Sequence, residues 1–156
     1  MTDFANDDLA LAVGHHLLIF ALAGVLAFEI GVVRQGMTGR DVRRVGRVDI
    51  WYGVLAAAIL AVGFSRAIFF AKGWAYYSVN LFFWAKIGTF ALVGLLSIMP
   101  TIAIIRWRRA LAADGAFLPS ADEIGKVRRY LWAEALLFAL IPAFAAAMAR
   151  GYGMLR

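Results

Sequence analysis

The stretch that decides the fold is residues 80–109, NLFFWAKIGTFALVGLLSIMPTIAIIRWRR. Within it, residues 81–105 form an apolar run of about 25 residues, which is long enough to cross the roughly 30 Å hydrocarbon core of a bilayer as a helix. Lys86 lies about two turns inside this run, where a cation is energetically costly and calls for a physical reason. The stretch therefore predicts a membrane-spanning helix that carries a charged group within the bilayer.

Three further apolar runs, residues 9–33, 48–71 and 130–149, make four predicted spans in one domain of 156 residues. The chain is 63% hydrophobic and 17% charged, whereas soluble domains carry about a quarter charged residues. The runs are far longer than the roughly ten-residue strands of a membrane β-barrel, so we predict an all-α integral membrane four-helix bundle. The sequence has no cysteine, which excludes disulfides, thiolate metal sites and thiol redox chemistry.

Lysine and arginine are concentrated in two segments, residues 34–47 and 106–129, which we expect to be loops after the first and third spans. Eleven of the sixteen Lys and Arg residues lie there: Arg34, Arg40, Arg43, Arg44, Arg47, Arg106, Arg108, Arg109, Lys126, Arg128 and Arg129. Such loops stay on the cytoplasmic side, so four spans place both termini on the periplasmic, outer side. Because the arginines flank apolar runs, the net charge of +6 indicates membrane topology and no nucleic-acid partner. The acidic residues 1–8 are unlike a signal peptide, so the first span is expected to remain uncleaved.

Four polar residues within the spans are predicted to lie at one depth near the outer surface. At about 1.5 Å of rise per residue, His15 and His16 lie roughly 10 Å below that surface, and Arg66 and Lys86 lie about 9 Å below it. Arg150 ends the fourth span close to the same surface. Consecutive helical residues diverge by about 100°, and the helical phase favours His15 over His16 as the side chain that faces the bundle. We expect no carboxylate in this layer, so its charge is positive.

Helical phase also bears on the two cations. Lys86 lies on the most polar face of the third span, and Arg66 shares a face with Gly63, a small residue typical of close helix approach. Between these spans, residues 72–80 form a short turn with three aromatic residues suited to the headgroup region. The phase is compatible with a cavity between the helices and with cations that snorkel into the headgroups.

An imidazole in a positively charged layer is complementary to an acidic or redox-active ligand. Haem b is one candidate, with His15 as the metal ligand and with Lys86, Met148 or no residue as the second axial ligand. Its propionates would then contact Arg66, Lys86 or Arg150. A quinone is the second choice, with His15 and Lys86 donating hydrogen bonds to its oxygens. In the purely structural alternative, the cations snorkel and His15 bonds to a neighbouring helix. The predicted cofactor-binding residues are His15, His16, Arg66, Lys86 and Arg150.

A second polar layer is predicted near the cytoplasmic surface. It comprises the carboxylates Glu29, Asp49 and Glu134 and the nearby arginines Arg47, Arg106 and Arg129. Carboxylates within a turn or two of an arginine cluster usually form interhelical ion pairs that fix helix packing. We expect that role here, with a proton relay as the alternative.

Several short motifs are distributed along the spans: RVD at 47–49, FWAK at 83–86, LLS at 95–97 and PT at 100–101. Together they resemble a family of small bacterial membrane proteins, the domain of unknown function 2214 family, and the similarity extends from His15 to Gly151. The resemblance implies a multi-pass protein of the bacterial inner membrane.

A weaker resemblance rests on His15 in the first span, Arg66 in the second, and Lys86 with Trp84 in the third. These residues are similar to those of the haem-dependent bacterial protoporphyrinogen oxidases, and the resemblance implies haem binding. Those enzymes carry a Tyr-His pair later in the third span, whereas residues 95–97 here are Leu-Leu-Ser, and the Trp–Lys spacing also differs.

Three functions remain open from the sequence. The leading hypothesis is an inner-membrane protein with an outer-leaflet ligand site for haem b or a quinone, which serves electron transfer; if the protein is an enzyme, it is a membrane oxidoreductase. The second is a non-catalytic membrane subunit of a larger complex. The third is a small transporter of an anionic solute, attracted by Arg66 and Lys86. The expected surroundings are the lipid bilayer and either a second copy of the chain or a larger membrane complex.

Overall fold

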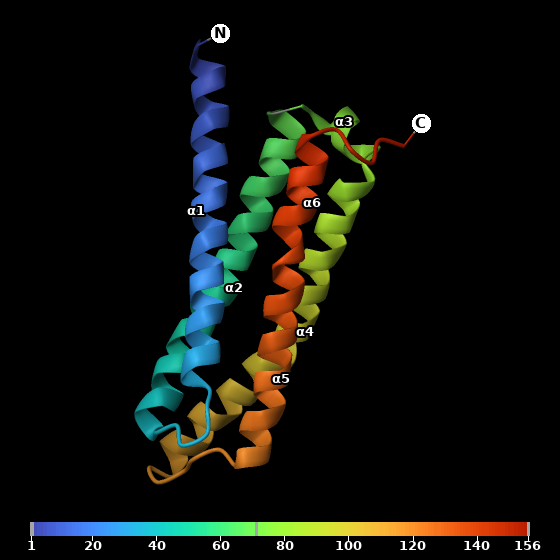
Figure 1. The fold of residues 1–156 in the computed structure, drawn as a ribbon. Coiled ribbons are helices and arrows are strands. Elements are labelled where there is room, and N and C mark those ends of the chain that lie inside the picture. Colours follow the sequence, from blue (N-terminus) through green and yellow to red (C-terminus); the bar gives the residue numbers. More distant parts are fainter. Residues whose placement is uncertain (1, 71, 156) are drawn as a thin grey trace.

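The computed structural model describes residues 2–70 and 72–155, with side chains from residue 6 onward. The described residues fold into six helices, of which the long ones run side by side along one bundle (Figure 1): α1 (Thr2–Val32), α2 (Gly39–Phe69), α3 (Trp74–Ser78), α4 (Leu81–Ala113), α5 (Ala121–Phe138) and α6 (Leu140–Ala149). Four helical segments, the last made of α5 and α6, are long and apolar enough to cross a membrane. The predicted all-α four-helix membrane bundle is therefore confirmed.

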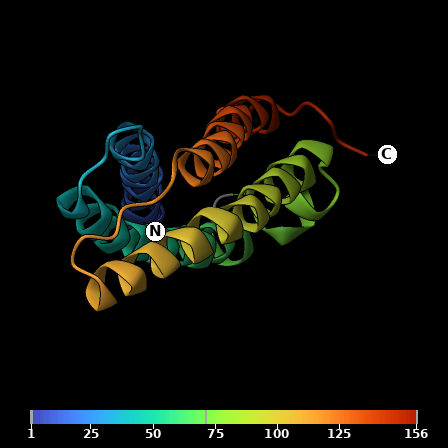
Figure 2. The same ribbon diagram turned by 90° about the horizontal axis from the view of Figure 1, so that it is seen from below.

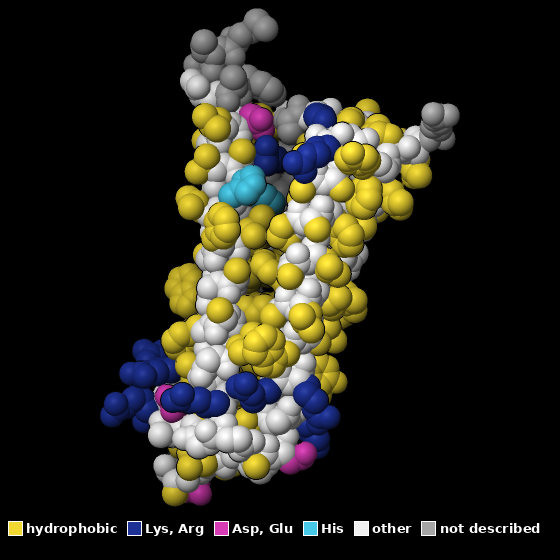
Figure 3. Space-filling model, viewed as in Figure 1, with side chains coloured by type: hydrophobic (Ala, Val, Ile, Leu, Met, Phe, Trp, Pro, Cys, Tyr) yellow, Lys and Arg dark blue, Asp and Glu magenta, His cyan; other side chains and the backbone are white. Residues whose placement is uncertain are grey.

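The start of α1 and the C-terminal tail lie at one end of the bundle, which we name the terminal end (Figure 1). The turns 33–38 and 114–120 lie at the other, where lysine and arginine gather (Figure 3), and we name it the basic end. The flanks between the ends carry large apolar side chains, and Phe20, Leu95 and Leu136 are 70%, 64% and 69% exposed. Such an apolar surface is typical of a protein surrounded by lipid.

The helices extend beyond the apolar runs into the basic segments 34–47 and 106–129, and the loops within them are short, at residues 33–38 and 114–120. Helix α2 begins at Gly39 because Thr38 accepts a hydrogen bond from the Asp41 amide, and the Asp41 carboxylate accepts one from the Thr38 amide. Helix α4 continues through its arginines to Ala113. Local caps thus set the helix ends, and the membrane boundaries 9–33, 48–71, 81–105 and 130–149 stay predictions.

The fourth predicted span consists of two helices, because α5 ends at Phe138 and α6 begins at Leu140. Pro142 explains the break: it has no amide hydrogen, and its ring meets the carbonyl of the residue four positions earlier, Phe138. Viewed along the bundle, α6 leans away from α1 and stays beside α4 (Figure 2). This divergence opens the bundle at its terminal end.

Candidate functional site

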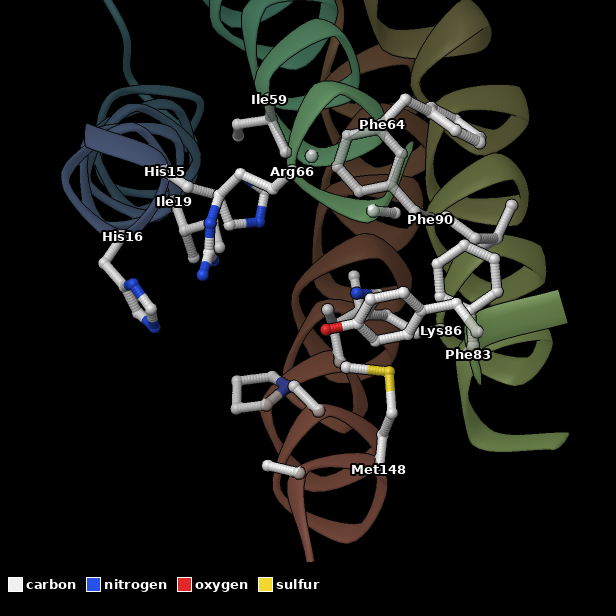
Figure 4. A pocket seen from close by; sticks show the side chains of 18 of the residues that line it. His15, His16, Ile19, Ile59, Phe64, Arg66, Phe83, Lys86, Phe90 and Met148 are labelled. Carbon is white, nitrogen blue, oxygen red and sulfur yellow. The ribbon is translucent and has the colours of Figure 1, made fainter. Parts of the chain in front are cut away.

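A cavity of about 660 Å³ lies in the terminal half of the bundle, where the helices diverge (Figure 4). Its walls are mostly apolar and include Ile19, Ile59, Phe64, Phe83, Phe90, Phe138 and Ile141. Its polar lining comprises His15, His16, Arg66, Lys72, Tyr76, Tyr77 and Lys86. The structure therefore brings four of the five predicted site residues around one space.

The cavity opens sideways between α1 and α6. Among the described residues, no Cα atom of α1 lies within 8 Å of a Cα atom of α6, although α1 packs on α5 further down. Phe20 of α1 and Pro142 of α6 both line the cavity. The flanks of the bundle on this side carry exposed apolar side chains such as Phe20.

His15 packs closely on Gly63 of α2. A Cβ atom at Gly63 would lie 3.0 Å from Cε1 of His15, so the imidazole packs directly on the α2 backbone. Its Nδ1 atom is buried and has no hydrogen-bond partner among the described residues. His16 is exposed, and its Nδ1 lies 2.7 Å from the carbonyl oxygen of Ala12. The prediction that His15 faces the bundle more directly than His16 is confirmed, although His16 also reaches the cavity lining.

Arg66 is not the free cation that the sequence predicted. Its Nη2 atom lies 3.4 Å from Oδ1 of Asp8 in a partly exposed ion pair, so the expected absence of a carboxylate from this layer is wrong. The reason is the length of α1, which begins at Thr2 and so carries Asp8 as part of a regular helix. Asp8 precedes His15 by seven residues, or two turns, which places both on one helix face.

Lys86 faces the cavity. Its side chain is half-buried, and its Nζ atom lies 5.4 Å from the centre of the Phe83 ring. Across the described ranges it forms no hydrogen bond and no ion pair. An ammonium group inside a largely apolar cavity therefore keeps its hydrogen-bonding capacity for another molecule.

The turn between α2 and α4 closes the terminal end of the cavity. Lys72 Nζ donates a hydrogen bond of 3.1 Å to the hydroxyl of Tyr76, which donates one of 3.2 Å to the carbonyl of Met148. Sequence reasoning missed Lys72, Tyr76 and Tyr77 as lining residues, because an aromatic turn beside a span is also what the headgroup region selects. The sequence contains no signal that distinguishes aromatic residues lining a cavity from aromatic residues lying in the headgroup region.

The C-terminal tail is tied to the same turn by Asn80, which is fully buried. Its side chain caps α4 by accepting a hydrogen bond from the amide of Phe83 at 3.1 Å, and it donates one of 3.0 Å to the carbonyl of Tyr152. The amide of Leu81 also donates to the carbonyl of Gly153 at 2.8 Å. This one residue therefore joins a helix start to the tail.

Comparison with known proteins places the chain in a family. The family model described as "Predicted membrane protein (DUF2214)" matches residues 7–153. The chain belongs to the DUF2214 family. No curated protein and no solved structure matches it, so the resemblance to haem-dependent protoporphyrinogen oxidases finds no support there. The family description gives a membrane location and no activity, so the function of this DUF2214 protein has to be argued from its cavity.

Arg150 is the predicted site residue that the fold does not bring to the cavity. It follows α6 as its C-terminal cap, is exposed, and is not among the lining residues. Met148, two residues earlier, does line the cavity. A 100° rotation per residue separates the two side chains, so similar depth does not ensure a shared direction.

The second polar layer of this DUF2214 protein differs from the prediction. Glu29, Asp49 and Glu134 are buried, with exposures of 2%, 8% and 1%. The described residues contain no ion pair between these carboxyls and any arginine. The expected ion pairs with Arg47, Arg106 and Arg129 are therefore wrong; the guanidinium of Arg106 instead pairs with Glu123 at the surface.

Proposed function

We propose that the cavity binds a lipophilic ligand of the quinone type, which would give this protein a role in membrane electron transfer. The observation that carries the proposal is the Lys86 ammonium on a largely apolar cavity, where it contacts the Phe83 ring and has no hydrogen-bond or ion-pair partner among the described residues. A quinone offers carbonyl oxygens that accept hydrogen bonds from the Lys86 ammonium, and His15 lines the same cavity. Its ring is apolar and suits the Phe64, Phe83 and Phe90 side chains.

The sideways opening supports the same ligand class. A molecule dissolved in the bilayer reaches the cavity between α1 and α6 without crossing the headgroups. An anionic solute from water would have to leave its hydration shell for walls that are mostly apolar, at a large cost in free energy. Arg66, which attracts such an anion in the transporter hypothesis, is already paired with Asp8. A lipophilic ligand therefore fits better than a soluble anion.

Haem b is the second candidate, favoured by His15 and Met148 on the lining of one cavity. When bound, haem would supply one-electron chemistry, with His15 as the iron ligand. The present geometry fits it less well. Both ring nitrogens of His15 lie within 3.8 Å of the Cβ position of Gly63, so the edge that would meet iron faces the α2 backbone. Arg66 is paired with a carboxylate, and Arg150 lies outside the cavity, so neither is free to hold propionates.

The test uses the full-length protein in lipid nanodiscs and a short-chain ubiquinone analogue, whose binding is followed by quenching of tryptophan fluorescence. We expect saturable binding that Lys86→Met weakens about tenfold or more, because a hydrogen bond to a charged group contributes about 1.5–3 kcal/mol and 1.4 kcal/mol is tenfold. Lys126→Met is the matched control, since Lys126 pairs with Asp122 on the surface of the basic end.

Two outcomes would overturn the proposal. One is absence of saturable quenching, or equal affinity in wild type and Lys86→Met, which leaves only a lipid-filled space. The other is a Soret absorption band in the purified protein that His15→Ala removes, which would make haem b the ligand instead.

A further inference from the structure

The basic half of the bundle buries three carboxyl groups, which come from three different helices. Glu29 comes from α1, Asp49 from α2 and Glu134 from α5, and all are more than nine-tenths buried. The hydroxyl of Tyr52 donates a hydrogen bond of 3.0 Å to Oε2 of Glu134. The hydroxyl of Thr101 donates one of 2.8 Å to Oδ1 of Asp49. Each of these two carboxyls therefore has one donor.

Glu29 and Glu134 nevertheless have unsatisfied oxygens. Oε1 of Glu29 and Oε1 of Glu134 are buried and accept no hydrogen bond from any described residue. The carboxyl group of Glu29 makes no hydrogen bond with any side chain or backbone group within the described ranges. An ionised carboxylate that is buried without a donor or a counter-charge costs several kcal/mol. Something other than the surrounding side chains must therefore neutralise this pair.

The nearby cations do not supply that charge. On α4, Arg108 donates its hydrogen bond to the carbonyl of Gly46 at 3.0 Å. On α5, Arg128 donates to the carbonyls of Ile30 and Val33 at the end of α1. In the part of the chain that the structure describes, no group of His, Asp and Glu residues is arranged to hold a metal ion. The counter-charge that the geometry leaves room for is a proton.

We propose that Glu29 and Glu134 form a proton-binding site, which holds at least one proton at neutral pH inside the membrane part of the bundle. A proton removes the charge and converts an acceptor oxygen into a donor for a neighbouring carboxyl, as in other carboxylate pairs that share a site. The titratable and charged groups around the pair are Asp49 and Tyr52 on α2, Arg108 on α4 and Arg128 on α5.

This site is separate from the cavity. Glu29 follows His15 by fourteen residues, which is about 21 Å along α1. Leu22 and Leu26 lie between them on the same side of the helix, with exposures of 1% and 3%. On α5 the two sites lie closer, because Phe138, one turn after Glu134, lines the cavity. Neither carboxyl lines the cavity, and the proton-binding proposal does not depend on the identity of the cavity's ligand.

The experiment is infrared spectroscopy of the full-length protein in lipid nanodiscs. At neutral pH we expect a carboxylic-acid C=O band that shifts in D₂O and decreases as the pH is raised. Glu29→Gln and Glu134→Gln each reduce the band, and the double variant removes at least half of it. Asp122→Asn is the control, because Asp122 is exposed and paired with Lys126, and its substitution leaves the band unchanged.

A wild-type protein without this band at neutral pH would overturn the proposal, and so would a band that neither glutamine variant reduces. A band that disappears when sodium replaces choline in the buffer would also overturn it, in favour of a cation site. The variants keep side-chain shape, and circular dichroism checks their fold. If a variant fails to fold, the pH titration of the wild-type band still decides.

Discussion

Gly63→Ala tests the contact on which the cavity depends. A Cβ atom at this position would lie 3.0 Å from Cε1 of His15, a distance at which the imidazole has to move. Gly53→Ala is the matched control, because Gly53 lies in the same helix and a Cβ atom there meets nothing within 4 Å. The two variants therefore make the same chemical change and differ only in the neighbour that they meet.

The expected magnitudes follow from two opposing effects. Alanine in place of glycine stabilises a helix interior by about 0.8–1 kcal/mol, and both variants gain this amount. Overpacking costs about 1–3 kcal/mol, and only Gly63→Ala places a Cβ atom against a neighbour. Because His15 borders the cavity and has room to shift, we expect the free energy of unfolding of Gly63→Ala to lie about 1 kcal/mol below that of Gly53→Ala, at the low end of that range. Displacement of His15 also weakens quinone binding in Gly63→Ala alone.

The assay is unfolding in a mild detergent titrated with a denaturing one, followed by circular dichroism. A double-mutant cycle with His15→Ala isolates the contact, since Gly63→Ala costs nothing once the imidazole is gone. Equal stabilities of Gly63→Ala and Gly53→Ala, together with no coupling to His15→Ala, would refute the packing argument. That result would also mean that the missing Cβ atom of Gly63 is not what allows His15 to pack on α2.

Three further predictions concern polar contacts. They are tested by measuring the stability of each variant in thermal unfolding, or its affinity for the ligand. Asn80→Ala removes a helix cap and a donor to the tail, so we expect a loss of about 2 kcal/mol in the free energy of unfolding. Asp8→Asn frees Arg66 from a partly exposed ion pair; it changes stability by at most about 1 kcal/mol and raises the affinity for an acidic quinone analogue at low salt. Tyr52→Phe removes the donor to Glu134, leaves that carboxyl without a partner and costs about 1–3 kcal/mol.

Matched variants separate these effects from general damage. Asn6→Ala and Asp7→Asn change exposed residues of α1, and Tyr130→Phe removes a hydroxyl that donates no hydrogen bond in the described structure. Each should leave stability and ligand affinity unchanged. A control that behaves like its partner variant, or a partner variant that behaves like wild type, would contradict the corresponding contact.

The number of membrane spans and their helical type were predictable because the bilayer removes alternatives. Backbone groups in hydrocarbon have to bond within their own segment, so a long apolar run has one regular conformation available. Helix periodicity also predicts which side chains of one helix point in the same direction. For this reason the sequence correctly indicated that His15 faces the bundle more directly than His16. The same local physics underlies the cap at Thr38.

Contacts between helices were predicted less well, because residues close in depth need not face each other. Asp8 was missed as the partner of Arg66, although its position two turns before His15 was a usable signal. The inner carboxyls were assigned to arginines that are near them in sequence. The fold instead turns Arg108 and Arg128 toward backbone carbonyls.

The sequence by itself determined a four-span helical membrane protein with charged groups at two depths, since length, hydropathy and helical period are local properties of the chain. The tertiary structure alone decided that α6 diverges from α1 after Pro142, that Lys86 faces the resulting cavity, and that Glu29 and Glu134 are buried without a cation partner among the described residues. The physical reason is that these features depend on how helices far apart in sequence pack on one another, and one helix's periodicity contains no information about its neighbours.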